Sequence, residues 1–235
     1  MAENIIDKFA KVNVLRHSLA HILAYAVREL YKDVSFGYGP AVENGFYYDF
    51  KLPSNLEESD LLLIQEKMNE IISKKLEFSQ KEVPIAKAKK LFAQQSFKLE
   101  TIDALASDKS IQTVSVYSVG DFIDLCVGPH VKNTKEIKAG SFRLLRVSGA
   151  YWKGDADNEM LQRIFGIAFE TKQELETYEQ KLSEISKRDH RVLGKELDLF
   201  SLDRDIGLGL PLFHPKGAIV RFLLQNFSQQ AHMMN

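Results

Sequence analysis

The sequence is short of cysteine, of long apolar runs and of net charge. The single cysteine, Cys126, excludes an internal disulfide and suits a reducing compartment such as the cytosol. No run of about 18 apolar residues is present, so we expect no membrane-spanning helix. The first residues also lack the apolar core of a signal peptide, so we expect a cytoplasmic protein. A net charge of −1 provides no global field to attract nucleic acid, so such contacts must come from a local patch.

What is present is the composition of an ordinary globular protein. The 235 residues are 45% hydrophobic and 27% charged, which is enough for one or two domains with a sizeable core. The sequence contains no internal repeat and no low-complexity segment. Function must therefore be sought in individual motifs.

Two histidines four residues apart, His17 and His21, lie in a stretch with helical periodicity. Residues at helical spacing predict a helix over about 15–31 with one apolar stripe: Leu15, Leu19, Ile22, Ala26 and Leu30. At about 100° per residue both histidines project nearly opposite that stripe. We expect them to face a cleft or solvent, although such a pair taken alone is most often surface chemistry without a role.

A second pair, Cys126 and His130, follows about a hundred residues later, with Gly128-Pro129 predicting a tight turn between its members. His-x3-His together with Cys-x3-His can ligate a metal or form a hydrolytic site. Spacing alone favours zinc, because imidazole and thiolate are its preferred ligands.

Several blocks of the sequence together resemble bacterial threonyl-tRNA synthetase, in the order and spacing of its editing domain. The blocks span most of the chain: His17-Ser18-Leu19-Ala20-His21, Gly39-Pro40, Gly45-Phe46-Tyr47-Tyr48-Asp49, Asp124-Leu125-Cys126-Val127-Gly128-Pro129-His130, Gly149-Ala150-Tyr151-Trp152, Leu161-Gln162-Arg163-Ile164-Phe165-Gly166 and Arg188-Asp189-His190-Arg191. The His-x3-His motif alone is shared with the alanyl-tRNA synthetase editing family.

The resemblance implies a function, namely hydrolysis of serine mischarged onto threonine tRNA, within an enzyme that ligates threonine to tRNA with ATP. It implies an editing site formed by His17, His21, Lys98, Asp124, Cys126 and His130. In this site a histidine relays protons, Lys98 positions water or steadies negative charge, and Asp124 binds the amino group of serine. A Cys–His pair also permits a covalent route through Cys126, but the ester is already activated and direct hydrolysis suffices.

The resemblance also implies that this editing site uses no metal. The related alanyl family uses the four positions His17, His21, Cys126 and His130 for zinc, so a zinc site remains the alternative. Two other readings stay open: a zinc-stabilised tRNA-binding module without catalysis, and a stand-alone deacylase of the alanyl type. For the whole enzyme the resemblance implies ATP, Mg, one Zn and a homodimer, with this chain alone a monomer.

We predict an α+β fold, with a two-layer, mainly antiparallel editing domain over 1–170, a linker helix over 171–190 and the incomplete start of a class II aminoacylation domain over 191–235. The expected strands cover 35–40, 45–50, 96–102, 114–119 and 142–152, with a turn at Glu43-Asn44-Gly45. Residues 160–169 are ambiguous by period, and the resemblance favours a strand. The expected helices cover 61–76 behind a capping box at Ser54 and Glu57, a short segment after Pro84, 172–188, and a last segment from Pro215.

Two further expectations concern surfaces. Basic residues that follow the Cys-x3-His motif form the best candidate patch for RNA phosphates, against the simpler reading that they aid solubility: Lys132, Lys135, Lys138, Arg143, Arg146 and Lys153. In the last helix, Ile219, Phe222 and Phe227 belong to a stripe whose partners in a class II sheet this sequence does not contain.

Overall fold

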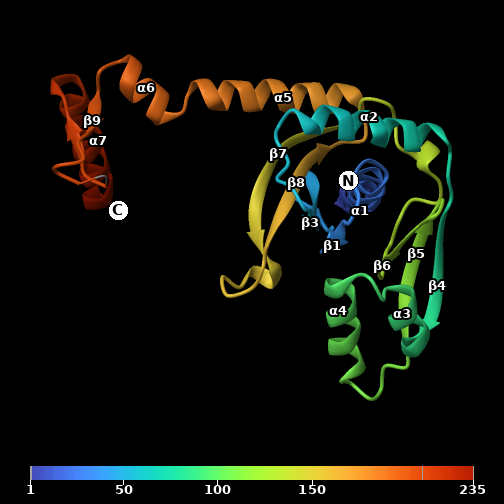
Figure 1. Ribbon diagram of the computed structural model, residues 1–235. Coiled ribbons are helices and arrows are strands. Elements are labelled where there is room, and N and C mark those ends of the chain that lie inside the picture. Colours follow the sequence, from blue (N-terminus) through green and yellow to red (C-terminus); the bar gives the residue numbers. More distant parts are fainter. Residues whose placement is uncertain (1, 208, 235) are drawn as a thin grey trace. The chain divides into compact units, whose positions relative to one another are not determined.

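The computed structural model describes the backbone of residues 2–207 and 209–234, and side chains within those ranges from Ala10 onward. Contacts divide the chain into two compact units, 1–175 and 176–235. Met1 and Asn235, the outer bounds of the predicted domains, lie outside the described residues. The first unit combines helices with antiparallel sheets, which confirms the predicted α+β class (Figure 1).

The larger sheet of the first unit has the strand order β1–β3–β8–β7, with the short β2 paired to β3. All its pairs are antiparallel, and its strands are β1 (Ser35–Phe36), β2 (Ala41–Val42), β3 (Gly45–Lys51), β7 (Phe142–Tyr151) and β8 (Met160–Ala168). Of the predicted strand over 35–40, only residues 35–36 form a strand, and β2 begins just after the predicted range. The ambiguous segment at 160–169 is a strand, and Asn44 takes the positive φ of +61° that a tight reversal favours.

A second antiparallel sheet has the order β4–β5–β6, formed by β4 (Phe78–Pro84), β5 (Thr113–Val119) and β6 (Phe122–Leu125). Tyr117 of β5 lies directly opposite Asp124 of β6, so these two side chains share one face of the sheet. Between β4 and β5 the chain forms two helices, α3 (Ile85–Leu91) and α4 (Ser96–Ala106). Strand β6 ends immediately before Cys126, and so fixes where the Cys-x3-His loop begins.

The long helix α1 (Ala2–Leu30) forms the centre of the first unit (Figure 1). Most of its predicted stripe is buried, with Leu19, Ile22 and Ala26 each fully inaccessible, while Leu30 at its end is partly buried. However, Ala20, Leu23, Ala24 and Val27 on its other faces are also fully buried, so the helix is enclosed rather than amphipathic. Helix α2 (Asp60–Ser73) packs against it through Ile64, Met68 and Ile71.

Two local predictions were wrong. The segment predicted as a strand over 96–102 is helix α4, whose buried residues Phe97, Lys98 and Ile102 lie on one helical face. Its seven residues contain too few apolar positions to separate a period of 2 from one of 3.6. The capping box at Ser54 and Glu57 is also absent, because α2 begins only at Asp60.

The second unit contains short elements around a small antiparallel hairpin. Helix α5 (Lys172–Lys187) leads into it, and the following elements are α6 (His190–Glu196), β9 (Phe200–Leu202), β10 (Pro211–Phe213) and α7 (Pro215–Met234). As expected, Ile219, Phe222 and Phe227 of α7 remain 62%, 61% and 73% exposed. Among the described residues, no helix combines the length and the apolar character that crossing a bilayer requires.

Candidate functional site

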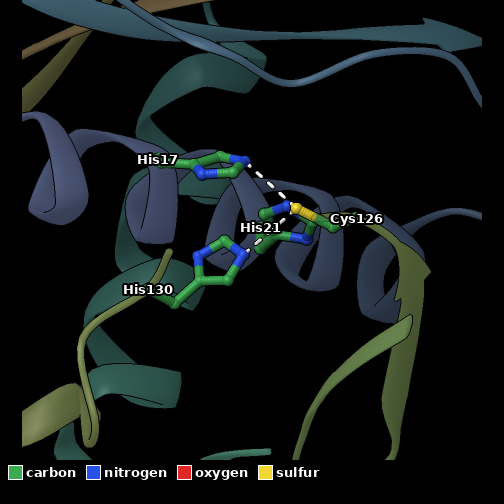
Figure 2. Close-up of side chains that lie close together, drawn as sticks. All are labelled: His17, His21, Cys126 and His130. Carbon is green, nitrogen blue, oxygen red and sulfur yellow. Dashed lines mark hydrogen bonds between the residues drawn. The ribbon is translucent and has the colours of Figure 1, made fainter. Parts of the chain in front are cut away.

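Cys126 lies at the meeting point of three imidazoles (Figure 2). Its Sγ lies 3.3 Å from Nε2 of His17 and 3.3 Å from Nε2 of His130. One ligand atom from each of His17, His21, Cys126 and His130 can be chosen so that all four lie within 4.8 Å of one another. The expected convergence of the two motifs is therefore observed, with α1 contributing one pair and the loop after β6 the other.

Each of the three histidines is oriented through its other ring nitrogen. Nδ1 of His17 lies 3.2 Å from the carbonyl oxygen of Pro129, and Nδ1 of His130 lies 3.3 Å from Oγ of Ser18. Nδ1 of His21 lies 3.2 Å from Oδ2 of Asp124.

Asp124 links His21 to a second group of buried polar side chains. Its Oδ1 accepts from Nζ of Lys98 at 2.6 Å and from the backbone N–H of Leu125 at 2.8 Å. Its Oδ2 accepts from the Tyr48 hydroxyl at 2.6 Å and faces His21. Lys98 also donates to the Tyr48 hydroxyl at 3.0 Å.

The carboxylate of Asp124 is thereby saturated, because it has about four acceptor positions and four partners. The sequence-based expectation that Asp124 binds the amino group of serine does not fit this arrangement. Its position instead orients Lys98, Tyr48 and His21. Asp124 and Lys98 are 2% and 3% exposed, so the side chains packed around the pair fix its position.

Buried side chains of opposite charge stabilise one another's charged forms in this site. Burial alone would raise the pKa of Asp124, but Lys98 and His21 hold that pKa well below its usual range. Burial likewise opposes the charged form of His21, yet hydrogen bonds to Asp124 and Cys126 raise its pKa to about 9.

The pKa values of the thiol and of the third histidine are both lowered. Burial would raise the pKa of Cys126, but hydrogen bonds from His130, His17 and His21 lower it to about 3. Burial, with the nearby charge of His21, lowers the pKa of His130 to about 4. Two cations, Lys98 and His21, thus balance two anions, Asp124 and Cys126.

A cavity of about 710 Å³ opens onto this cluster. His17, Lys98, Asp124 and Cys126 line one part of it, and apolar side chains such as Leu105 line another. Its volume falls in the range of small-molecule sites. The histidine pair of α1 therefore faces a cleft, as predicted, although His21 is only 4% exposed.

Gly39 forms part of the cavity wall because nothing larger fits there. A Cβ added at this position would lie 2.1 Å from the ring of Tyr48. We expect Gly39→Ala to displace Tyr48 from Asp124 and to destabilise the fold by about 1–3 kcal/mol, as overpacking does. Denaturant unfolding measures the loss, and Gly209→Ala, where an added Cβ has no neighbour within 4 Å, is the control. Equal unfolding curves for the two variants would contradict the packing described.

All six predicted site residues come together, and all six residues of the predicted basic patch are exposed. Lys132, Lys135 and Lys138 are exposed on the segment that follows His130. Lys153 pairs with Glu100 of α4 at 2.6 Å. Tyr48 was not predicted as a site residue, since an aromatic residue in a strand predicts packing rather than a hydrogen bond to a carboxylate.

The four-residue cluster also suits a zinc ion. Zinc bonds of about 2.0–2.3 Å require ligand atoms about 3.3–3.7 Å apart, and the two Cys126–histidine separations are 3.3 Å. The outward Nδ1 contacts match the support that metal-ligating histidines receive. Geometry alone therefore fits both a metal-free site and a zinc site.

Comparison with known proteins agrees with this geometry. Residues 114–165 match the family "Threonyl and Alanyl tRNA synthetase second additional domain". A threonine–tRNA ligase of Dehalococcoides mccartyi is 48% identical over 98% of this chain and 39% of its own length. Those of Bacillus velezensis and Pelobacter propionicus are 47% and 46% identical, over 92% and 94% of this chain and 33% and 34% of their own lengths. The chain thus spans about two fifths or less of these relatives, and nearly all of it is similar to threonine–tRNA ligases.

Proposed function

We propose that this chain hydrolyses serine from mischarged threonine tRNA, as the editing part of a threonine–tRNA ligase. The ligase activity itself, with ATP, Mg and a Zn ion as its cofactors, is proposed for the whole enzyme only. The observation that carries the editing proposal is the convergence of His17, Lys98 and Cys126 on one cavity, around a saturated Asp124.

His17 is proposed as the proton relay. It is only partly buried and lines the cavity, with Nδ1 facing the carbonyl oxygen of Pro129 and Nε2 lying 3.3 Å from Sγ of Cys126. A water that gives a proton towards Nε2 adds to the ester carbonyl carbon. The bond between that carbon and the ribose oxygen then breaks, and the proton passes to the ribose oxygen.

Lys98 is proposed to stabilise the negative charge that develops on the carbonyl oxygen. An ammonium fixed beside the reacting carbonyl needs no reorganisation when that charge appears. Asp124 and Tyr48 hold the ammonium in position without contacting the substrate. Asp124 is thus a positioning residue in this mechanism.

Selection of serine over threonine needs a second site because the two amino acids differ by one methyl group. Such a difference is worth only about 1–3 kcal/mol in a single binding step. An editing cavity discriminates in the reverse sense, because a wall excludes the larger side chain.

The partner of this reaction is proposed to be threonine tRNA, with Lys132, Lys135 and Lys138 contacting its phosphates.

Three further proposals follow from the similarity to threonine–tRNA ligases. The whole enzyme is proposed to be a homodimer, while this chain alone is proposed to be a monomer. Its location is proposed to be the cytoplasm, which fits a reduced Cys126 in the site.

Incubation with charged tRNA tests the function. We expect the chain to deacylate threonine tRNA charged with serine and largely to spare the same tRNA charged with threonine. Release of both amino acids at equal rates would contradict selective editing, and release of neither would contradict hydrolysis.

Replacement of Cys126 by serine separates a supporting role from a covalent one. We expect the deacylation rate to fall by less than about tenfold, since direct attack by water needs no thiolate intermediate. A thiolate whose pKa is lowered by three imidazoles is also a weakened nucleophile. Trapping of a seryl-enzyme intermediate, or complete loss of activity in Cys126→Ser, would establish the covalent route instead.

A second candidate function is a zinc-stabilised tRNA-binding module, which the converging ligand atoms of His17, His21, Cys126 and His130 favour. In that case zinc would be held structurally and its removal would unfold the domain. One zinc per chain by elemental analysis, with unfolding on chelation and no deacylation, would support this function. Lys98 and Asp124, which a zinc site does not require, favour editing.

A further inference from the structure

Helix α4 carries Lys98, and it is held both by the β4–β5–β6 layer and by contacts with the larger sheet. Within that layer, α4 packs through Ile102 in a small core with Val83, Ala88 and Phe92. On the opposite side it meets the turn between β7 and β8, where a short 3-10 segment covers Trp152–Gly154. Figure 1 shows this turn and α4 next to each other, although about fifty residues separate them in sequence.

Trp152 is the centre of this contact. It is 3% exposed and forms a separate apolar cluster with Phe97 and Leu161. Its ring centroid lies 4.7 Å from that of Phe97, the residue immediately before Lys98. On another side Tyr38 stacks on Trp152 at 4.6 Å, and the Tyr38 hydroxyl lies 3.2 Å from Oγ1 of Thr101 in α4.

Hydrogen bonds to Glu100 fix the position of α4 along the β7–β8 turn. Nε1 of Trp152 donates to one carboxylate oxygen of Glu100 at 2.8 Å. Nζ of Lys153 donates to the other at 2.6 Å. Lys153 itself has a positive φ of +56°, a conformation rare for a residue other than glycine, so the turn is strained into this shape.

The N-terminal end of α4 is fixed to the larger sheet as well. The side chain of Gln95, at the helix N-cap, accepts from the backbone N–H of Phe36 at 2.9 Å and donates to the carbonyl oxygen of Val34 at 3.0 Å. The part of α4 that bears Lys98 is thus attached on both sides of that residue, before it through Gln95 and after it through Glu100. A helix shift of one ångström there would move Lys98 relative to Asp124 by a similar amount.

We propose that Trp152 and Glu100 are positioning residues, which hold α4 so that Lys98 reaches Asp124 and Tyr48. Neither is assigned a contact with the substrate. This inference rests on the proposed editing function for its kinetic consequence, but its structural part stands on the contacts themselves. Loose attachment of α4 would lower catalysis because a displacement of about 1 Å is enough to lose much of a positioned group's effect.

Trp152 supplies its own readout, since it is the only tryptophan of the chain. We expect Glu100→Ala to expose Trp152 to acrylamide and to raise its fluorescence quenching constant at least twofold. The matched control is Asp103→Ala, also on α4, whose carboxylate pairs with Lys89 of α3 at 2.5 Å rather than with the β7–β8 turn. Quenching in the control should equal that of the wild type.

The kinetic arm combines Glu100→Ala with Lys98→Ala. Glu100→Ala alone should lower kcat for serine deacylation about tenfold with KM nearly unchanged, and should have no further effect once Lys98 is absent. Trp152→Phe, which keeps the stacking and loses the N–H, should show a smaller loss of the same kind. The proposal would be overturned if the rate losses of Glu100→Ala and Lys98→Ala multiplied in the double variant. It would also be overturned if Glu100→Ala exposed Trp152 and kept full activity.

A failure of the editing function can be distinguished from a failure of the positioning proposal. If the wild-type chain deacylates nothing, editing is wrong, and the positioning proposal is then decided by a crystal structure of Glu100→Ala. The proposal expects Nζ of Lys98 to move from its 2.6 Å contact with Asp124 in that variant. An unchanged contact would overturn it.

Discussion

Replacing Lys98 with alanine is expected to lower the rate of serine deacylation by about 10²-fold or more, as loss of a positioned oxyanion donor does. The same change should weaken the fold. Lys98 and Asp124 form a contact of 2.6 Å with both side chains almost inaccessible. Removing one member of a buried ion pair leaves an uncompensated charge and costs about 3–5 kcal/mol. Deacylation kinetics and denaturant unfolding measure the two effects.

A double variant separates catalysis from stability. Lys98→Met with Asp124→Asn removes both charges, so most of the lost stability should return while the rate stays low. Lys98 would then be needed for the reaction and not merely for folding. A double variant that regains both stability and full activity would show that Lys98 serves only to neutralise Asp124.

Replacing His17 with alanine is expected to lower deacylation by about 10²-fold or more while leaving the fold nearly intact. The kinetic loss follows from removing the group that exchanges a proton at Nε2. The fold should lose only about 0.5–1.5 kcal/mol for each lost hydrogen bond, because His17 is half-buried and makes two, to Pro129 and to Cys126. Circular dichroism and thermal unfolding, measured beside the rate, distinguish this result from that of Lys98→Ala.

His190 provides the matched control for His17. Its side chain is 82% exposed and lies in the second unit, so His190→Ala should change neither rate nor stability. Retention of the wild-type rate in His17→Ala would remove the proton relay from the mechanism. A loss of stability above about 3 kcal/mol would show instead that His17 is a core residue.

The elements with long or repeated patterns could be predicted from the sequence, and the short mixed ones could not. The helix around His17 and the helix from Lys172 to Lys187 follow apolar spacing sustained over several turns. The segment from Ser96 to Ile102 has only seven residues, and its lysine is buried because Asp124 lies opposite. That partner is 26 residues away in sequence, so no local pattern signals a buried lysine.

The membership of the site was more predictable than its internal connections. Motif spacing and family resemblance brought His17, Cys126 and His130 together, as the distances confirm. The role of Asp124 was not accessible in the same way, since its four hydrogen-bond partners depend on how Tyr48, Lys98 and His21 pack. Saturation of a carboxylate is a tertiary property that residue type alone does not determine.

Single-turnover deacylation by the metal-stripped chain tests the proposal of a metal-free editing site. After exhaustive chelation, with zinc below about 0.05 per chain by elemental analysis, serine-charged threonine tRNA is mixed with excess protein and serine release is followed. We expect a rate equal to that of the untreated chain, because charge compensation among Lys98, His21, Asp124 and Cys126 needs no ion. Loss of activity on chelation and its return with one equivalent of zinc would contradict the metal-free site.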